Sequence, residues 1–193
     1  MAKKTKSEPE PKEILPESKD LSIGILTKES VISDSDNLTR ELYDKTRYGE
    51  PIDNKKFQYS LFEALYLVER GKIKVVNEKK KDVAFDEFVK KARKIDNNFW
   101  VKYVVFKDLR KRGYIVKTAL KFGADFRVYD RGVKPGEDHA RWIVYPVSEA
   151  ESLTWHGFSS MNRVAHSTRK RLLVGCVDAE SDVTYWEIRW LRP

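Results

Sequence analysis

The stretch Phe122-Gly-Ala-Asp-Phe-Arg-Val-Tyr129 is followed, after a polar loop, by the run His139-Ala-Arg-Trp-Ile-Val144. The first run alternates, so Arg127 and Tyr129 lie on the face opposite its apolar side chains. Glycines and a proline in the loop predict a turn between two strands. If these strands pair, Tyr129 and His139 meet near the base of the loop, with Tyr129 directed away from the core toward solvent or substrate.

A third run, Arg163-Val-Ala-His-Ser-Thr-Arg-Lys170, lies further along the chain. Its pattern predicts a short helix over residues 162–171. On such a helix Arg163, Ser167 and Lys170 share one face, because they are spaced at i, i+4 and i+7. The two cations of this stripe suit phosphate.

Tyr129, His139 and Lys170 together suit cleavage of RNA by acid–base chemistry without a metal. RNA carries its own nucleophile, the 2′-hydroxyl, so cleavage needs a base, an acid and a cation. The pKa of a histidine near neutrality suits the acid, and Lys170 can stabilise the developing charge. A tyrosine has an ordinary pKa of about 10, which nearby cations such as Lys170 and Arg127 can lower.

Each of these residues has an ordinary structural alternative. Tyrosines in strands are mostly packing residues, a histidine at the start of a strand is often only exposed, and a helical lysine is usually solvated. His156 and His166 also lie near the third run. The residues alone therefore do not single out His139.

The charge of the chain favours an anionic partner. The 193 residues are 40% hydrophobic, enough for a core, and the formal net charge is +8. Residues 90–127 hold twelve lysines and arginines against three aspartates. This concentration favours nucleic acid, and the alternative is a solvated, salt-bridged surface.

The remaining composition narrows the class of protein. The single cysteine, Cys176, excludes a disulfide within the chain and fits a reducing, cytoplasmic compartment. We predict that it is a buried small apolar residue. No run approaches the roughly 18 apolar residues of a membrane span, so we expect no membrane association. One cysteine and three histidines cannot build a usual structural zinc site, and we expect no metal and no cofactor.

The patterns along the chain predict an α/β (α+β) protein of two domains. A polar tail over residues 1–20 is expected to be disordered, an N-terminal α/β domain covers 21–95, and a C-terminal α/β domain with a mixed sheet covers 96–193. Residues 23–46 are expected to form short strands and turns. The expected helices are one with Phe57, Leu61, Ala64, Leu65 and Val68 on one face, ended by Gly71, one with Phe85, Phe88, Val89, Ala92 and Ile95, and one over 99–112. The expected strands are 73–76, 114–120, 125–129, 140–147, 172–177 and 183–191.

Several motifs in the same order resemble the archaeal-type tRNA-splicing endonucleases, the tRNA-intron endonuclease family. They are His139 and the segments Leu109–Thr118, Gly123–Tyr129 and Arg163–Lys170. The helix Ser60–Leu67 resembles the N-terminal domain of the family. The resemblance covers about residues 48–193 and implies a restriction-endonuclease-like C-terminal catalytic domain.

The resemblance implies an endonuclease that cuts both exon–intron junctions of precursor tRNA in a bulge–helix–bulge fold. The products would carry a 2′,3′-cyclic phosphate and a 5′-hydroxyl, with no metal required. By position, Tyr129 matches the general base of the family, His139 its general acid and Lys170 its electrostatic stabiliser. Arg163 matches an arginine that contacts a bulge base, and a second clamping residue is expected near Tyr185 or Trp186. We add Arg127 and Ser167 to the expected RNA-binding residues.

Family members assemble as a dimer of dimers, in which an acidic loop of one subunit enters a basic pocket of another. The segment Asp178-Ala-Glu-Ser-Asp182 lies where that loop belongs, so we expect Asp178, Glu180 and Asp182 to serve assembly. The alternative is an ordinary polar hairpin turn. The strand 183–190 is the expected dimer contact. Because one chain holds both site and loop, we favour a homotetramer over a subunit that needs a different partner.

Two other functions compete with this interpretation. A non-catalytic RNA-binding or structural subunit of the same fold would not need the full set of Tyr129, His139 and Lys170. A metal-dependent DNA nuclease would need clustered carboxylates for magnesium, and no such array lies near the basic segment.

Overall fold

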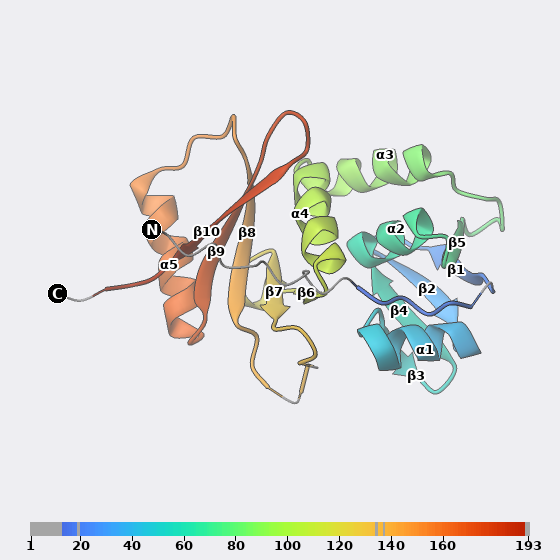
Figure 1. Ribbon diagram of the computed structural model, residues 1–193. Helices are drawn as coiled ribbons and strands as arrows, with labels where there is room; N and C mark the ends of the chain where they lie inside the picture. The colour runs from blue at the N-terminus through green and yellow to red at the C-terminus, as the bar shows by residue number, and fades with distance from the viewer. Residues whose placement is uncertain (1–12, 19, 134, 137, 192–193) are drawn as a thin grey trace, which may run out of the picture.

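The computed structural model describes residues 13–18, 20–133, 135–136 and 138–191. Figure 1 shows two sheets, each with its own helices, that pack on either side of a central helix. Each sheet is mixed and has five strands, in the orders β3-β4-β2-β1-β5 and β10-β9-β8-β7-β6. The mixed α/β class and the mixed C-terminal sheet predicted from sequence are confirmed.

The first sheet belongs to the N-terminal part of the chain. Its strands are β1 (Ser22–Leu26), β2 (Ser30–Asp34), β3 (Glu50–Asp53), β4 (Lys56–Ser60) and β5 (Ile73–Val76). Its helices are α1 (Asn37–Thr46), α2 (Leu61–Glu69) and α3 (Phe85–Ile95). Only the β1–β5 pair is parallel.

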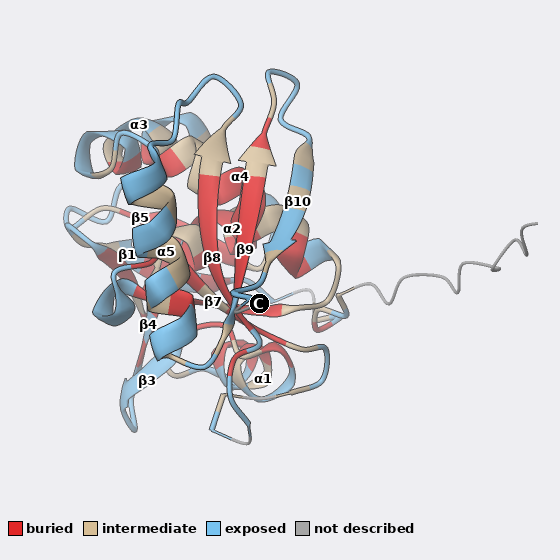
Figure 2. Cartoon of the chain, turned by 90° about the vertical axis from the view of Figure 1, so that its left-hand side faces the viewer, coloured by how far each residue is buried: buried red, intermediate tan, exposed pale blue. Residues whose placement is uncertain are grey.

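The second sheet lies between α4 (Phe99–Lys111) and α5 (Trp155–Ser167). Its strands are β6 (Ile115–Thr118), β7 (Phe126–Tyr129), β8 (Trp142–Ser148), β9 (Arg171–Val177) and β10 (Val183–Ile188). A short 3₁₀ turn, Leu120–Phe122, follows β6. Figure 2 shows β8 and β9 as the buried centre, whereas β10 and α5 are largely exposed. We propose that the second domain begins with α4, because this helix packs on β6, β8 and β9.

Two predictions for the N-terminal half were wrong. Phe57 lies in β4 and not on the following helix, because the capping box of Ser60 and Glu63 starts α2 at Leu61. Residues 23–46 contain a helix as well as strands. The Asp36 carboxylate caps α1 by accepting a hydrogen bond from the Thr39 backbone N–H at 2.7 Å. Aspartate is a favoured residue at this position, but the spacing of apolar residues alone did not indicate the helix.

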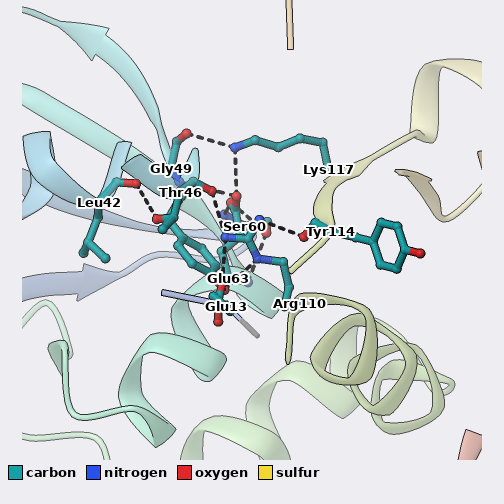
Figure 3. Close-up of polar contacts among 10 residues, drawn as sticks. Glu13, Leu42, Thr46, Gly49, Ser60, Glu63, Arg110, Tyr114 and Lys117 are labelled. Carbon is teal, nitrogen blue, oxygen red and sulfur yellow. Dashed lines mark hydrogen bonds and ion pairs between the residues drawn. The ribbon is translucent and has the colours of Figure 1, made fainter. Parts of the chain in front are cut away.

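Buried ionic contacts join the two halves. The Lys117 ammonium on β6 donates to the Glu63 carboxylate of α2 at 2.8 Å and to the Gly49 carbonyl at 2.9 Å (Figure 3). Lys117 is 6% exposed and Glu63 is 5% exposed. The second oxygen of the same carboxylate accepts the Ser60 backbone N–H at 3.0 Å. Glu63 therefore caps α2 and pairs with the C-terminal sheet at once.

A second contact involves Arg110 of α4, which is 2% exposed. Its guanidinium donates to the Tyr48 hydroxyl at 2.7 Å and the Thr46 carbonyl at 2.8 Å, and lies 3.1 Å from the Glu13 carboxylate. Glu13 also accepts a hydrogen bond from the Tyr66 hydroxyl at 2.8 Å. The prediction of a disordered tail is thus wrong for residues 13–18, because Glu13 supplies a counter-charge to Arg110. Residues 1–12 of that tail lie outside the described residues.

Four cations of the basic segment contact groups of the same chain. Lys102 pairs with Asp96 and Asp125, and Lys107 pairs with Glu69. Arg110 and Lys117 are buried. Other cations of the segment remain exposed, namely Lys90, Arg93, Lys94, Lys111 and Lys121. The net charge alone therefore does not locate an anion site.

We predict that Glu63→Gln lowers the free energy of unfolding by about 3–5 kcal/mol, because Lys117 is left buried without a counter-charge. Lys117→Met in the same chain should recover part of that loss. Burial opposes ionisation of Glu63, but Lys117 lowers the pKa of this carboxyl overall. Its stabilising effect is therefore present above the unfolded-state pKa and is lost as the pH falls.

Urea unfolding of both variants measures this effect. Glu87→Gln is the matched control, since the exposed Glu87–Lys91 pair on α3 should contribute only about 0.5 kcal/mol. Equal losses for Glu63→Gln and Glu87→Gln would contradict the role of the buried pair.

Candidate active site

Tyr129, His139 and Lys170 line one cavity of about 340 Å³. The topology brings them together: β7 is antiparallel to β8, and β8 is parallel to β9. The end of β7 and the starts of β8 and β9 therefore meet at one edge of the sheet. At that edge, the Arg141 N–H donates to the Val128 carbonyl at 2.8 Å, and the Arg171 N–H donates to the Arg141 carbonyl at 3.0 Å. The other lining residues are Phe122, Arg127, Gly136, Asp138 and Ala140.

Tyr129 ends β7 and is more enclosed than the sequence suggested. Its side chain is 5% exposed and packs with Ile115 and Ala140. The sequence predicted that Tyr129 leaves the core face toward solvent or substrate; it is shielded from solvent but lines the cavity. Its neighbour Val128 nevertheless faces the main core, so the alternation is confirmed and Tyr129 reaches the cavity from the opposite face.

His139 is exposed in the loop that leads into β8. Its backbone N–H donates to the Asp138 carboxylate at 2.6 Å, which fixes the loop at the point where the imidazole branches. The described part of this loop contains two left-handed glycines, Gly132 at φ 77° and Gly136 at φ 98°. Only glycine adopts such angles without strain, so the turn predicted from these residues is confirmed.

Lys170 does not lie on a helix, contrary to the prediction. The helix α5 begins seven residues earlier than expected, at Trp155, and ends at Ser167. Arg169 takes a left-handed conformation with φ 55°, and Lys170 follows as the residue before β9. The shared helical face of Ser167 and Lys170 is therefore lost.

Lys170 is held at the cavity by weak contacts. Its ammonium donates to the Thr168 carbonyl at 2.8 Å and lies 5.5 Å from the centre of the Phe122 ring. Burial, and then the repulsion of Arg127, lower the pKa of the Lys170 ammonium. No carboxylate pairs with Lys170 in the described part of the chain, so its charge faces the cavity.

The expected RNA-binding residues do not all lie together. Arg163 lies on the outer face of α5, in a cavity shared with Arg189 and Trp190. Tyr185 instead turns toward α4 and donates its hydroxyl to Asp108 at 2.9 Å. Burial, together with the Asp108 carboxylate, raises the pKa of Tyr185. Tyr185 therefore packs within its own chain and does not line the Arg163 cavity.

Trp186 is 51% exposed on the outer edge strand and does not line the Arg163 cavity. The residues that do, Arg189 and Trp190, were missed because they follow the end of β10. The run of aromatic and basic residues at the C-terminus is the signal that could have indicated them. Ser167 donates its hydroxyl to the Val164 carbonyl at 3.0 Å, within the last turn of α5.

The acidic segment 178–182 forms the hairpin between β9 and β10. The Asp178 carboxylate accepts the Asp182 N–H at 2.8 Å, so Asp178 stabilises its own turn. Asp182 lines a cavity with Lys107 and Lys111 of the same chain. Glu180 is exposed at the tip, and its side chain makes no hydrogen bond or ion pair within the described residues.

Among the described residues, no group of three or more His, Cys, Asp and Glu side chains lies close enough together to hold a metal ion. None of the described helices has the length and apolarity needed to cross a membrane. Cys176 is a free, partly exposed thiol, which corrects its expected burial.

Two family models match the chain. The tRNA intron endonuclease N-terminal domain matches residues 22–89, and the catalytic C-terminal domain matches residues 99–185. The chain belongs to the tRNA intron endonuclease family. The resemblance found in the sequence is thereby confirmed, and the cavity lies within the part that matches the catalytic domain.

Several curated relatives bear the name tRNA-splicing endonuclease. The protein of Thermococcus onnurineus is 41% identical over 167 residues, which cover 86% of this chain and 95% of the relative. The protein of Methanothermobacter thermautotrophicus is 41% identical over 170 residues, covering 88% and 98%. That of Nanoarchaeum equitans is 43% identical over 148 residues, covering 74% and 93%.

Substitutions of Arg169 test whether the turn before Lys170 depends on the left-handed backbone conformation of this residue. Arg169→Gly should fold at least as stably, because glycine adopts φ 55° freely. Arg169→Val should lose about 1–2 kcal/mol, since a β-branched residue is strained there. Thermal unfolding of both variants measures the difference, and equal melting temperatures would show that the turn does not depend on this conformation.

Proposed function

We propose that this protein excises introns from precursor tRNA by cutting both exon–intron junctions in a bulge–helix–bulge RNA. The observation that carries the proposal is the shared cavity of Tyr129, His139 and Lys170. The cuts leave a 2′,3′-cyclic phosphate and a 5′-hydroxyl. The names of the relatives support the substrate class.

Tyr129 acts as the general base and takes the proton of the 2′-hydroxyl. The 2′-oxygen then forms a bond to phosphorus, and the bond from phosphorus to the 5′-oxygen breaks. His139 acts as the general acid and gives a proton to the departing 5′-oxygen. The exchange is a transesterification, so it needs no water, metal or cofactor to balance it.

Lys170 stabilises the negative charge that develops on the phosphoryl oxygens. Its ammonium can make three hydrogen bonds, and only one, to the Thr168 carbonyl, is formed within the described residues. The remaining donors are directed at no carboxylate. Burial, and then the repulsion of Arg127, lower the pKa of the Lys170 ammonium, and a bound phosphodiester would supply an opposing charge.

A second surface contacts the unpaired nucleotides of the bulge. Arg163 is exposed and has no ion-pair partner among the described residues. Arg189 and Trp190 border the same hollow, and their planar groups suit stacking on a base. This pairing replaces the expected clamp at Tyr185 or Trp186.

The variant His139→Ala tests the acid assignment. We predict that cleavage falls by about 10²–10⁴-fold, the usual contribution of general acid–base catalysis, while RNA binding changes little because the imidazole is exposed. Single-turnover cleavage and filter binding of a precursor tRNA measure the two effects.

His156→Ala is the matched control, because this histidine is exposed on α5 and outside the cavity. If the control abolishes cleavage and His139→Ala does not, the assignment of the acid is wrong. Loss of binding together with cleavage in His139→Ala would make it a structural residue.

The proposal includes a cytoplasmic homotetramer, assembled as a dimer of dimers through β10 and the acidic hairpin. Glu180 is the hairpin acid best placed to meet another subunit, since Asp178 stabilises its own turn and Asp182 borders lysines of its own chain. The exposed Trp186 on the edge strand supplies apolar surface for the dimer contact.

Sedimentation velocity tests this assembly. The mass of the wild-type assembly should be four times the 22.6 kDa mass of the monomer. Glu180→Lys should lower the mass toward that of a dimer, because the proposed loop enters a basic pocket of another subunit. Glu151→Lys, an exposed change in another loop, should leave the mass unchanged. A wild-type monomer, or a tetramer unaffected by Glu180→Lys, would contradict this role of the loop.

A further inference from the structure

Arg127 is a cation of the cavity that has no role in the proposed steps of Tyr129, His139 and Lys170. Its side chain is half-buried, and its Nε is buried without a hydrogen-bond partner. It makes no ion pair or hydrogen bond within the described residues, in contrast to Arg110, Arg141 and Arg171, which pair with carboxylates. A buried donor without a partner carries a cost in stability, so the arrangement calls for an explanation.

The surroundings of Arg127 indicate an anion. Its guanidinium lies 6.0 Å from the centre of the Tyr129 ring and lines the cavity together with His139 and Lys170. Its charge repels that of Lys170 and helps to lower the pKa of the lysine. Asp138 is the one acid among the described lining residues, and it accepts the backbone N–H of His139.

The backbone of β7 holds Arg127 in place. Arg127 occupies β7 between Phe126 and Val128, both 0% exposed, and pairs with Lys117 on one side and Ile143 on the other. Lys117, the nearest other cation in the sheet, is committed to Glu63 and Gly49. Arg127 is therefore the strand cation that is free to meet a ligand.

We propose that the Arg127 guanidinium binds a non-bridging oxygen of the scissile phosphodiester and acts as a second catalytic cation beside Lys170. This inference rests on the proposed function, because it assigns the group that holds the reacting phosphate. The planar fork of a guanidinium matches phosphate oxygens, and Arg127 lines the cavity with no carboxylate paired to it among the described residues.

The two cations have separable tasks in the same transesterification. As the 2′-oxygen adds to phosphorus, one extra negative charge spreads over the non-bridging oxygens before the 5′-oxygen leaves with its proton from His139. Arg127, fixed by the sheet, supplies a preorganised donor for that charge. Lys170, the residue before β9, supplies a second cation from another side of the cavity.

The first test uses Arg127→Met and Arg127→Lys in single-turnover cleavage of a bulge–helix–bulge RNA. The methionine variant should lose about 10²–10³-fold in rate, as removal of one preorganised donor does, with RNA affinity within about threefold. The lysine variant should recover part of the rate. Arg141→Met is the control, since Arg141 pairs with Asp130 outside the cavity, and it should cut within about threefold of the wild type.

Two outcomes would overturn the proposal. One is cleavage by Arg127→Met at the wild-type rate. The other concerns a phosphorothioate that replaces the scissile non-bridging oxygen with sulfur. If this substitution slows the wild type and Arg127→Met by the same factor, the proposal is wrong. If Arg127 holds that oxygen, the sulfur substitution should slow the wild type more than Arg127→Met.

The second test does not need cleavage or a variant. In the wild-type protein, the Arg127 Nε–H resonance should shift when uridine 2′,3′-cyclic phosphate is added, and the Arg141 Nε–H resonance should not. An unmoved Arg127 resonance at saturation would overturn the anion site. If the wild type fails to cut the RNA but this resonance shifts, the proposed function is wrong and the anion site stands.

Discussion

The Glu63 carboxylate is the contact on which the arrangement of the two sheets depends. One oxygen completes the capping box of α2, and the other accepts the ammonium of Lys117 from β6. Both side chains are buried, so neither charge is stable without the other. Because β6 pairs with β7, which carries Arg127 and Tyr129, this contact also anchors the strand that builds one wall of the cavity.

The cavity itself follows from topology more than from the chemistry of any single residue. Two strands begin at one edge of the sheet and a third ends there, so residues from positions 129, 139 and 170 meet. The parallel β8–β9 pair needs a crossover, which α5 provides. The same crossover places Arg163 on the outer face, away from the catalytic cavity.

Sequence reasoning succeeded where the signal was local. Alternation in residues 126–129 and glycines in the following loop predicted the β7–β8 region, and the run around Lys170 supplied the third residue of the cavity. It failed where tertiary contacts decide. The helical spacing from Phe57 was interrupted by a capping box, and the end of α5 was set by the left-handed Arg169, an unusual conformation for a residue other than glycine.

The count of charged residues in the sequence was the poorest guide to where those residues lie in the structure. The excess of lysine and arginine over residues 90–127 favoured a nucleic-acid surface, yet Arg110 and Lys117 are among the most buried polar residues. Composition gives the number of charges and not their partners. Arg127, a basic residue of the same segment, lines the cavity and makes no ion pair among the described residues, which the sequence alone does not reveal.

The analysis of product ends tests the central claim most directly. The purified wild-type chain, alone and in EDTA, is incubated with a precursor tRNA that carries a bulge–helix–bulge. We expect cuts at both junctions, with a 2′,3′-cyclic phosphate on one side and a 5′-hydroxyl on the other. Products with 5′-phosphate ends, or cleavage that appears only when magnesium is restored, would contradict an acid–base site built from Tyr129, His139 and Lys170.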